Sequence, residues 1–407
     1  MKQFNVPIIY RSPLIAAIKS KRKAMDKMKK DFTPTLLDFG PLRIYLARHF
    51  GFCYGVENAI EIAFRTIDEN PGKRIFLLSE MIHNPQVNAD LRQRGVQFLQ
   101  DTHGQPIIPF SSLTPEDVVI IPAFGTTLKI EEELEAIGIP TKKYNTTCPF
   151  VEKVWNRSEQ IARNNYTVVV HGKPSHEETR ATFSHAAANA PTLIVNDMEE
   201  AVLLGKFISG ELPLEEFYSR FAGRYSAGFD AARDLQQIGV VNQTTMLASD
   251  TQAIADYLKS VMVARYGLTA ENTETRFADT RDTLCYATHD NQSAVYGLLE
   301  TAADLAIVVG GYNSSNTSHL VELCEQRIAT YFINSEEKII SAGEILHYDF
   351  HHKQEIITRD FLPSRRPLQI LITSGASCPD ALVEGVINKL VSFFPAERSV
   401  EDLMAAF

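Results

Sequence analysis

His49-Phe50-Gly51-Phe52-Cys53-Tyr54-Gly55-Val56 sets a pattern that the rest of the chain repeats. An apolar run over residues 42–46 precedes this stretch and a helical pattern follows it, which predicts a strand, a tight turn and a helix start. The cysteine stands at the turn, near the positive end of a helix dipole that favours the thiolate, the form that binds metal. Taken alone, a cysteine is more often a small buried hydrophobic residue. The prediction of a metal-binding cysteine is strengthened because the same arrangement occurs twice more in the chain.

The second cysteine stands in Thr147-Cys148-Pro149 and the third in Cys285-Tyr286-Ala287-Thr288, each just ahead of a helical stretch. This spacing matches no zinc finger or ferredoxin motif, because the ligands of those motifs cluster locally. If the three cysteines meet, three domains surround one point. Three thiolates on an iron–sulfur cube would leave one iron open to a substrate oxygen, whereas a structural zinc site adds a fourth protein ligand. Cys324 and Cys378 lack this context and are predicted to be packing residues.

Composition limits the possible classes of protein. The chain has 407 residues, 44% of them hydrophobic and 22% charged, which is typical of a soluble protein with two or three domains. No apolar run approaches the roughly 20 residues that span a bilayer, so we expect no membrane span and a cytoplasmic location. The net charge of −10 argues against nucleic-acid binding. Five scattered cysteines argue against a disulfide framework.

From residue 42 onward, short β-branched runs alternate with amphipathic helical stretches, which predicts an α/β fold with mostly parallel sheets. Residues 203–237 interrupt this alternation and are expected to form a helical surface insertion, with a lid as the alternative. Residues 1–40 are expected to be an extension with a solvated basic helix over 19–30, the alternative being a membrane-surface or targeting segment. The expected strands are 42–47, 74–79, 118–122, 166–170, 192–195, 238–241, 305–309, 329–333 and 368–373, and the expected helices include 56–67, 151–163, 293–302 and 319–327.

Two loops after expected strands are rich in hydroxyl and amide groups. Asn313-Ser314-Ser315-Asn316 follows a glycine turn and opens a helix, and Ser374-Gly375-Ala376-Ser377 does the same further on. Backbone N–H groups at a helix N-terminus form anion sites together with such side chains. Ordinary N-capping is the alternative interpretation. Two such loops from successive strands would be able to clasp a diphosphate.

Further polar groups follow other expected strands. His83-Asn84 and His176-Glu177-Glu178 each precede a helix, and Asn242-Gln243-Thr244-Thr245 ends the expected strand at 238–241. A lone histidine is more often a capping or core residue than a ligand. A histidine beside a carboxyl group is more suggestive, because an imidazole neutralises phosphate and a carboxyl group relays protons.

These motifs, in order, resemble the LytB/IspH family of 4-hydroxy-3-methylbut-2-enyl diphosphate reductases. The resemblance runs from about residue 43 to beyond residue 380. It implies three similar α/β domains around a central [4Fe–4S] cluster, one per chain, with three cysteine ligands and one open iron site. It implies the last step of the non-mevalonate isoprenoid pathway, in which an allylic hydroxyl is removed with two electrons and two protons to give isopentenyl and dimethylallyl diphosphates. The expected division is an extension at 1–40 and domains at 41–147, 148–284 with the insertion 203–237, and 285–407.

The resemblance also implies residue roles and partners. Glu178 would be the proton source and would work with Thr244. The electron donor would be ferredoxin or flavodoxin, and the chain would be a monomer or a homodimer. The cluster ligands would be Cys53, Cys148 and Cys285, and the diphosphate ligands would be His83, His176, Ser314, Ser315, Asn316 and Ser377.

One position departs from many bacterial members of the family, which have a histidine that contacts the diphosphate. This chain has Phe124 there, in Pro122-Ala123-Phe124-Gly125. The longer plant- and cyanobacteria-like branch also has phenylalanine there and an insertion before Asn242. We therefore interpret the change as a mark of lineage. A [4Fe–4S] hydro-lyase and a non-catalytic iron–sulfur sensor or anion-binding protein remain as alternatives from other classes.

Overall fold

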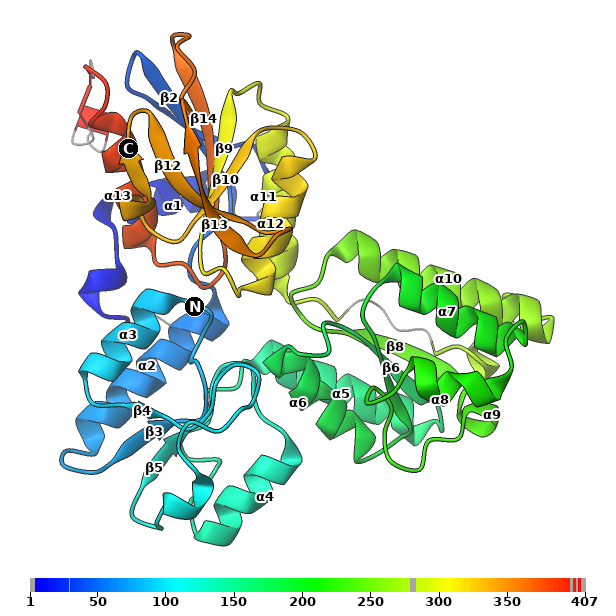
Figure 1. The fold of residues 1–407 in the computed structure, drawn as a ribbon. Helices are drawn as coiled ribbons and strands as arrows, with labels where there is room; N and C mark the ends of the chain where they lie inside the picture. The colour runs from blue at the N-terminus through cyan, green and yellow to red at the C-terminus, as the bar shows by residue number, and fades with distance from the viewer. Residues whose placement is uncertain (1–3, 29, 279–282, 396–397, 400–401, 404–407) are drawn as a thin grey trace. The chain divides into compact units, whose positions relative to one another are not determined.

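The computed structural model describes residues 4–28, 30–278, 283–395, 398–399 and 402–403 (Figure 1). Parts of the expected extension (1–3 and 29) and of the third expected domain (396–397, 400–401 and 404–407) lie outside the described residues. The chain divides into two compact units. Unit 1 contains Met1–Glu61, Ile82–Asp90 and Tyr286–Phe407, and unit 2 contains Ile62–Met81 and Leu91–Cys285.

Unit 1 is built on a five-stranded sheet with the order β1-β2-β14-β9-β10. Four strands are parallel, and β1 pairs antiparallel with β2. The sheet joins the beginning of the chain to its end, because the strand that leads to Cys53 pairs with β14. The strands are β1 (Thr35–Asp38), β2 (Leu42–Leu46), β9 (Leu305–Val309), β10 (Thr330–Ile333) and β14 (Leu368–Ser374).

Two pairs of helices flank this sheet (Figure 1): α11 (Tyr286–Leu299) packs against α12 (Ser315–Glu325), and α1 (Pro13–Met25) packs against α13 (Asp380–Val391). The expected basic helix at 19–30 was therefore placed too late, because α1 ends at Met25, whereas its expected exposure is confirmed: the described residues of 19–30 are exposed or half-buried. The helix begins at Pro13, and Leu14, Ile15 and Ile18 are almost fully buried. The apolar residues that direct its packing lie before the basic run, which drew the prediction toward the solvated end.

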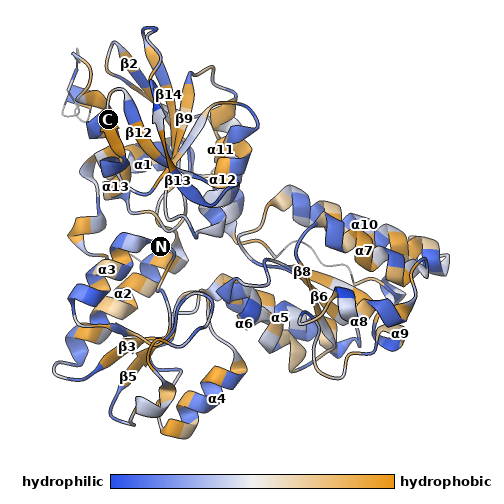
Figure 2. Cartoon of the chain, in the orientation of Figure 1, coloured by the Kyte–Doolittle hydropathy of each residue, from blue (hydrophilic) through white to orange (hydrophobic). Residues whose placement is uncertain are grey.

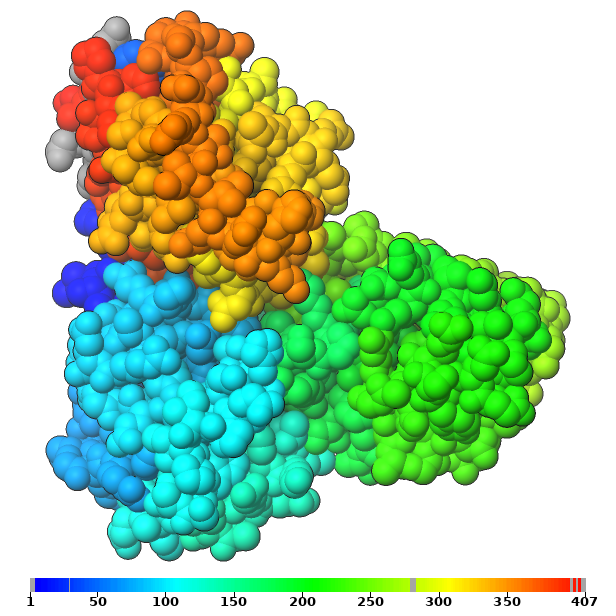
Figure 3. Space-filling view, in the orientation of Figure 1, coloured from blue at the N-terminus to red at the C-terminus, as the bar shows by residue number. Residues whose placement is uncertain are grey.

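A second, three-stranded antiparallel sheet of unit 1 was not predicted. It has the order β11-β12-β13, with β11 at Ile339–Ser341, β12 at Glu344–Asp349 and β13 at Gln354–Arg359. Most of its residues are exposed or half-buried, and it lies on the surface of unit 1, in yellow-orange to orange in Figure 3. We refer to residues 339–359 below as the surface sheet.

Unit 2 contains two three-stranded parallel sheets, β4-β3-β5 and β7-β6-β8. Apolar residues dominate their strands, as the orange of β3, β5, β6 and β8 in Figure 2 shows. The strands are β3 (Ile75–Leu77), β4 (Gln97–Phe98), β5 (Val118–Ile120), β6 (Thr167–His171), β7 (Thr192–Val195) and β8 (Ile238–Asn242). The helices that accompany them are α4 (Leu128–Ile137), α5 (Pro149–Arg163), α6 (Glu177–Ala187), α7 (Met198–Ser209), α8 (Phe217–Arg220), α9 (Ala231–Asp234) and α10 (Ala248–Tyr266), while α2 (Tyr54–Glu69) and α3 (Pro85–Gln93) each cross a boundary between the units.

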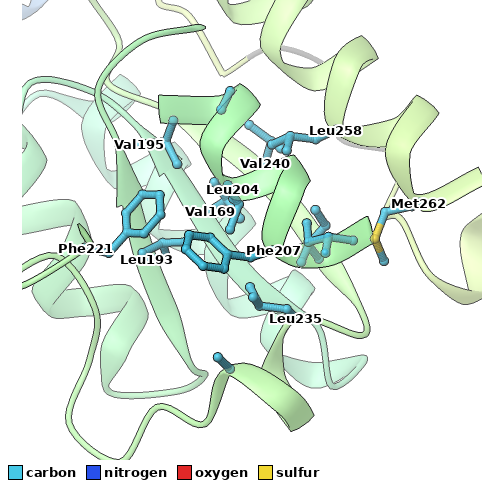
Figure 4. Packing of buried hydrophobic residues seen from close by; sticks show 14 of the residues in the cluster. Val169, Leu193, Val195, Leu204, Phe207, Phe221, Leu235, Val240, Leu258 and Met262 are labelled. Atoms are coloured by element: carbon cyan, nitrogen blue, oxygen red, sulfur yellow. The ribbon is translucent and has the colours of Figure 1, made fainter. Parts of the chain in front are cut away.

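Residues 203–237 are helical as expected, but they are not merely a surface insertion. Phe217 and Phe221 are fully buried and belong to the core of the β7-β6-β8 sheet. Figure 4 shows Phe221 in this core together with Phe207 of α7. The rings of Phe217 and Phe221 stack with centroids 5.1 Å apart, and Phe229 stacks on Phe217 at 5.4 Å. Aromatic residues carry the largest hydrophobic area per side chain, so they account for this burial without any strand.

The α/β class with mostly parallel sheets is confirmed, and all nine expected strands are present, with ends that differ by at most two residues. The boundaries at 41, 148 and 285 stay a prediction. Among the described residues, none of the helices is long and apolar enough to cross a membrane.

Candidate functional site

Unit 1 brings together two loops that follow neighbouring parallel strands, β9 and β14. The side chain of Ser314 caps α12 by accepting a hydrogen bond from the backbone N–H of Thr317 at 3.3 Å. Asn316 joins the two loops, because its Oδ1 accepts from the N–H of Ala376 at 2.9 Å. The carboxyl ends of neighbouring parallel strands lie at the same edge of a sheet, which explains this meeting.

A third segment of unit 1 joins the same group. Ser377 donates its hydroxyl to the backbone carbonyl of His83 at 3.2 Å. A Cβ on Gly311 would lie 2.2 Å from that same carbonyl, so only glycine lets the β9 loop pass His83. Cys53 lies beside these loops, since its N–H donates to the carbonyl of Ala376 at 3.2 Å. Five predicted anion-binding residues, His83, Ser314, Ser315, Asn316 and Ser377, are therefore in one unit with one predicted cluster ligand.

The Ser315 hydroxyl carries the clearest signal for a ligand in this group. Its Oγ is buried and has no hydrogen-bond partner, and Ser315 itself is only 4% exposed. Leaving a buried hydroxyl unsatisfied costs about 1–3 kcal/mol. Such an atom beside the capped N-terminus of α12 is suited to donate to an anion that the helix dipole attracts.

Unit 2 holds the predicted acid and its partner. Glu178, at the start of α6, is 1% exposed, and Thr244, after β8, is 4% exposed. The Thr244 backbone N–H donates to Glu178 Oε1 at 2.5 Å, and the Thr244 hydroxyl donates to Oε2 at 3.0 Å. Both carboxyl oxygens are therefore fixed. The Cys285 N–H donates in turn to the carbonyl of Thr244 at 3.2 Å, which places a predicted cluster ligand beside the pair.

Cys148 stands as the N-cap of α5 with Pro149 at the first helical position. Its N–H donates to the carbonyl of Ala123 at 2.9 Å. Burial raises the pKa of the Cys148 thiol to about 12, and the charges of Cys285 and Glu178 add to that rise. The thiol is therefore protonated in the absence of a metal, and binding of a metal ion would release that proton.

The chemistry of the donor atoms decides whether Cys53, Cys148 and Cys285 suit an iron–sulfur cluster. Within the described residues, no group of three or more His, Cys, Asp or Glu side chains is arranged to hold a metal ion. Cys148 and Cys285 are in unit 2 and Cys53 is in unit 1. All three are half-buried and directly precede a helix, and cysteine sulfur is the ligand that iron–sulfur clusters use. This donor set fits such a cluster.

His176 lies in unit 2, and its ring is fixed by two contacts. Its Nδ1 accepts the backbone N–H of Glu178 at 3.2 Å, so that nitrogen carries no proton in this arrangement. The ring of Phe124 meets the His176 ring edge-on, with centroids 5.6 Å apart. Phe124 therefore contacts a predicted diphosphate ligand.

Several residues that stabilise these groups were not predicted. Thr283 and Asn242 exchange hydrogen bonds, with the Thr283 N–H donating to Asn242 Oδ1 at 2.9 Å. Gln243 Oε1 accepts from the hydroxyl of Thr179 at 2.9 Å. Asn242 and Gln243 were quoted as motif residues, but the polar partners lie elsewhere in the sequence. No local signal indicated them.

The outcome for the remaining cysteines is simple. Cys324 and Cys378 are fully buried, and burial raises the pKa of each thiol to about 12. The prediction that both are packing residues is confirmed.

Comparisons with known proteins agree on one family. The family model described as LytB protein matches residues 44–391. The chain is similar to the 4-hydroxy-3-methylbut-2-enyl diphosphate reductase of Synechococcus sp. (strain RCC307), with 43% identity over 89% of this chain and 87% of the relative. It is also similar to the reductase of the same name from Prochlorococcus marinus (strain MIT 9211), with 42% identity over 90% of this chain and 88% of the relative.

Two solved structures share the fold. One is the E-1-hydroxy-2-methyl-but-2-enyl-4-diphosphate reductase from Plasmodium falciparum, with a TM-score of 0.61 and 22% identity over 86% of this chain and 88% of that chain. The other is an (E)-4-hydroxy-3-methyl-but-2-enyl diphosphate reductase described as the terminal enzyme of the non-mevalonate pathway. It gives a TM-score of 0.51 and 23% identity over 86% of this chain and 99% of that chain.

Proposed function

The chain belongs to the LytB family, and from that membership we propose that it is a 4-hydroxy-3-methylbut-2-enyl diphosphate reductase. The reaction removes the allylic hydroxyl of (E)-4-hydroxy-3-methylbut-2-enyl diphosphate and gives isopentenyl and dimethylallyl diphosphates. It is the last step of the non-mevalonate pathway of isoprenoid synthesis. Two electrons and two protons are consumed, one C–O bond breaks, one C–H bond forms, and the oxygen leaves as water.

The observation that best supports this function is the buried pair of Glu178 and Thr244. The two hydrogen bonds from Thr244 hold both oxygens of the Glu178 carboxyl group. Cleavage of a C–O bond needs the leaving oxygen to be protonated, and a positioned carboxyl group does this efficiently. When Glu178 is protonated, the hydrogen bond between its Oε2 and the Thr244 hydroxyl reverses, so the hydroxyl would accept a proton from Glu178 and donate its own to the substrate hydroxyl. The backbone hydrogen bond from Cys285 to Thr244 supports the proposal that this acid pair works beside a cluster ligand.

The diphosphate would be held by His83, His176, Ser314, Ser315, Asn316 and Ser377. The buried Ser315 hydroxyl and the N-terminus of α12 support this assignment. Holding the anionic tail fixes the position of the allylic carbon relative to the acid, which removes an entropic part of the barrier.

Cys53, Cys148 and Cys285 would hold one [4Fe–4S] cluster with an open iron, and three α/β domains would surround it. When bound, the cluster supplies the electrons and a Lewis acid for the hydroxyl. The electron donor would be a ferredoxin or a flavodoxin. We propose a cytoplasmic location and a monomer or homodimer.

The test is anaerobic turnover of (E)-4-hydroxy-3-methylbut-2-enyl diphosphate by protein reconstituted with iron and sulfide. A chemically reduced one-electron dye supplies the electrons, and the same dye in oxidised form is the control. We expect five-carbon diphosphate products only with the reduced dye. Products that form equally with the oxidised dye would indicate a hydro-lyase. An intact cluster with no product in either case would contradict the reductase and favour a sensor.

A further inference from the structure

Tyr312 lies in the turn between β9 and α12, immediately before Asn313-Ser314-Ser315-Asn316. The surface sheet, residues 339–359, has no part in the proposed chemistry. We propose that the surface sheet holds the β9 loop in the conformation that binds the diphosphate, and that Tyr312 is the positioning residue through which it does so. This inference rests on the proposed function, because it assigns the β9 loop to the substrate.

The ring of Tyr312 is held between a strand of each sheet of unit 1. It stacks face to face on Tyr348 of β12, with centroids 4.4 Å apart and planes 9° from parallel. It also meets the ring of Phe332 of β10 edge-on at 5.1 Å. Phe332 is 1% exposed and contacts Tyr348 as well, at 5.9 Å. Aromatic contacts of this geometry are directional, so the three rings fix the orientation of Tyr312 and not only its burial.

The hydroxyl of Tyr312 makes a second, independent contact with the surface sheet. It donates to Oε1 of Glu355 on β13 at 2.9 Å. The same oxygen pairs with the ammonium group of Lys338 at 2.6 Å. Lys338 belongs to the short helix η5 (Glu336–Lys338), which precedes β11 directly. Lys338 also offsets the negative charge of Glu355, which reduces the repulsion that this carboxylate would exert on a nearby anion.

The ionisation of these groups agrees with that geometry. The hydrogen bond from Lys338 lowers the pKa of Glu355 most, with the Tyr312 hydroxyl lowering it further against the effect of burial. Burial and the Glu355 carboxylate raise the pKa of Tyr312. At neutral pH the acceptor is therefore charged and the donor is protonated. Hydrogen bonds to charged groups are stronger than those between neutral groups.

The β9 loop is thereby held from two directions. On one side Gly311 lies against the His83 carbonyl, where a Cβ would come within 2.2 Å. On the other side Tyr312, the next residue, is fixed by the surface sheet. Ser314 and Ser315 follow after one further residue, and the Ser314 N–H bonds back to the carbonyl of Gly311 at 3.0 Å. A loop ordered before the ligand arrives binds it with a smaller loss of conformational entropy.

The experiment compares Tyr312→Ala, Tyr312→Phe and Glu355→Gln in the full-length, cluster-loaded protein. Tyr296→Phe, at an exposed tyrosine of α11, and Glu337→Gln, at an exposed glutamate beside Lys338, are the matched controls. Three quantities are measured: the dissociation constant of inorganic diphosphate by calorimetry, and kcat and KM for reduction of the hydroxylated diphosphate. Thermal melts check that each variant is folded.

We expect Tyr312→Ala to weaken diphosphate binding about tenfold and to raise KM by a similar factor, since it removes both the rings' contact and the hydrogen bond. Tyr312→Phe and Glu355→Gln should each cause a loss of about threefold, because each removes or weakens one hydrogen bond only. In all three variants kcat should stay within about twofold of the parent, as Tyr312 touches no reacting atom. The two controls should leave the dissociation constant, kcat and KM unchanged.

Unchanged KM and diphosphate affinity in Tyr312→Phe and Glu355→Gln would overturn the proposal, and these two variants decide the matter if Tyr312→Ala does not fold. A fall in kcat without a change in KM would also overturn it. An unaltered protein that does not bind inorganic diphosphate would overturn it as well. An unaltered protein that binds diphosphate but reduces no substrate contradicts only the proposed reductase, and the affinities of the variants would still test the role of Tyr312.

Discussion

Replacement of Glu178 by glutamine is the most direct test of the proposed chemistry. The substitution preserves the shape of the side chain and removes its ability to deliver a proton. Thr244 donates to both carboxyl oxygens. In Glu178→Gln the backbone N–H of Thr244 still finds an oxygen acceptor, and the Thr244 hydroxyl is able to rotate and accept from the new amide. The pair therefore stays hydrogen-bonded.

The expected magnitude follows from these contacts. Two hydrogen bonds to a carboxyl group are replaced by hydrogen bonds to an amide, which lowers the free energy of unfolding by at most about 1 kcal/mol each. The loss of general acid catalysis should lower kcat by about 10²- to 10⁴-fold, or roughly 3–5 kcal/mol in activation free energy. KM should change little, because the diphosphate ligands are other residues.

The assay is steady-state reduction of the hydroxylated diphosphate with a reduced dye, together with the visible absorption spectrum and iron content of the same sample. Glu177→Gln is a matched control, since Glu177 is the neighbouring buried glutamate of α6 and accepts from Ser79 rather than from Thr244. We expect this control to lower kcat less than tenfold. A Glu178→Gln protein with an intact cluster spectrum and near-normal kcat would refute the assignment of Glu178 as the acid.

Three further predictions concern the cluster, the core and pH. Cys148→Ser should lose most of its iron, measured by atomic absorption after reconstitution, while Cys324→Ser, at a buried cysteine outside the site, should retain it; equal iron in both would contradict the ligand assignment. Phe217→Ala should lower the free energy of unfolding by about 3–5 kcal/mol in urea titrations, against less than about 1 kcal/mol for the exposed Ile107→Ala. Burial raises the pKa of Asp117, but hydrogen bonds from Arg74 and Thr114 outweigh it and hold the pKa below its usual 3.8. The stability that Asp117 contributes is thus present above pH 3.8 and lost as the pH falls through the lowered pKa. The free energies of unfolding of Asp117→Asn and the parent, measured in urea titrations, should therefore become more similar below that pH. Free energies that diverge there would contradict the linkage between this pKa and stability.

The parallel strands could be predicted from the sequence because their residues form short, continuous apolar runs. All five residues of β6 and of β9 are buried, and such runs are typical of sheets covered on both faces. The surface sheet gave no such signal. In β13 the residues from Gln354 to Arg359 are exposed or half-buried, and polar side chains dominate them. A strand with little burial has a weak pattern, so its register depends on the neighbouring strands.

In the candidate site, too, the residues within short motifs could be predicted from the sequence, whereas the contacts between distant positions could not. Motifs such as Thr147-Cys148-Pro149 and His176-Glu177-Glu178 are contiguous, so residue type and a following helix were enough to select them. The contacts that orient the motifs join positions far apart in the chain. Thr244 reaches back to Glu178, and Thr283 reaches back to Asn242. Thr283 lies two residues before Cys285, but nothing in the sequence indicates that it pairs with Asn242.

The two anion loops of unit 1 indicate why the surface sheet matters for the substrate although it lies outside every motif. Hydrogen bonds between motif residues join the two loops, because Asn316 bonds to Ala376, and they also hold the β14 loop to the His83 carbonyl through Ser377. The β9 loop has Gly311 at its start, and glycine gives the backbone freedom that the other residues do not. Tyr312, the next residue, is the first with a side chain that is able to anchor the loop, and it does so through a sheet that follows it in the chain. A change in β12 or β13 should then alter KM before it alters fold or kcat, since the parallel sheet carries the core and the acid lies in the other unit.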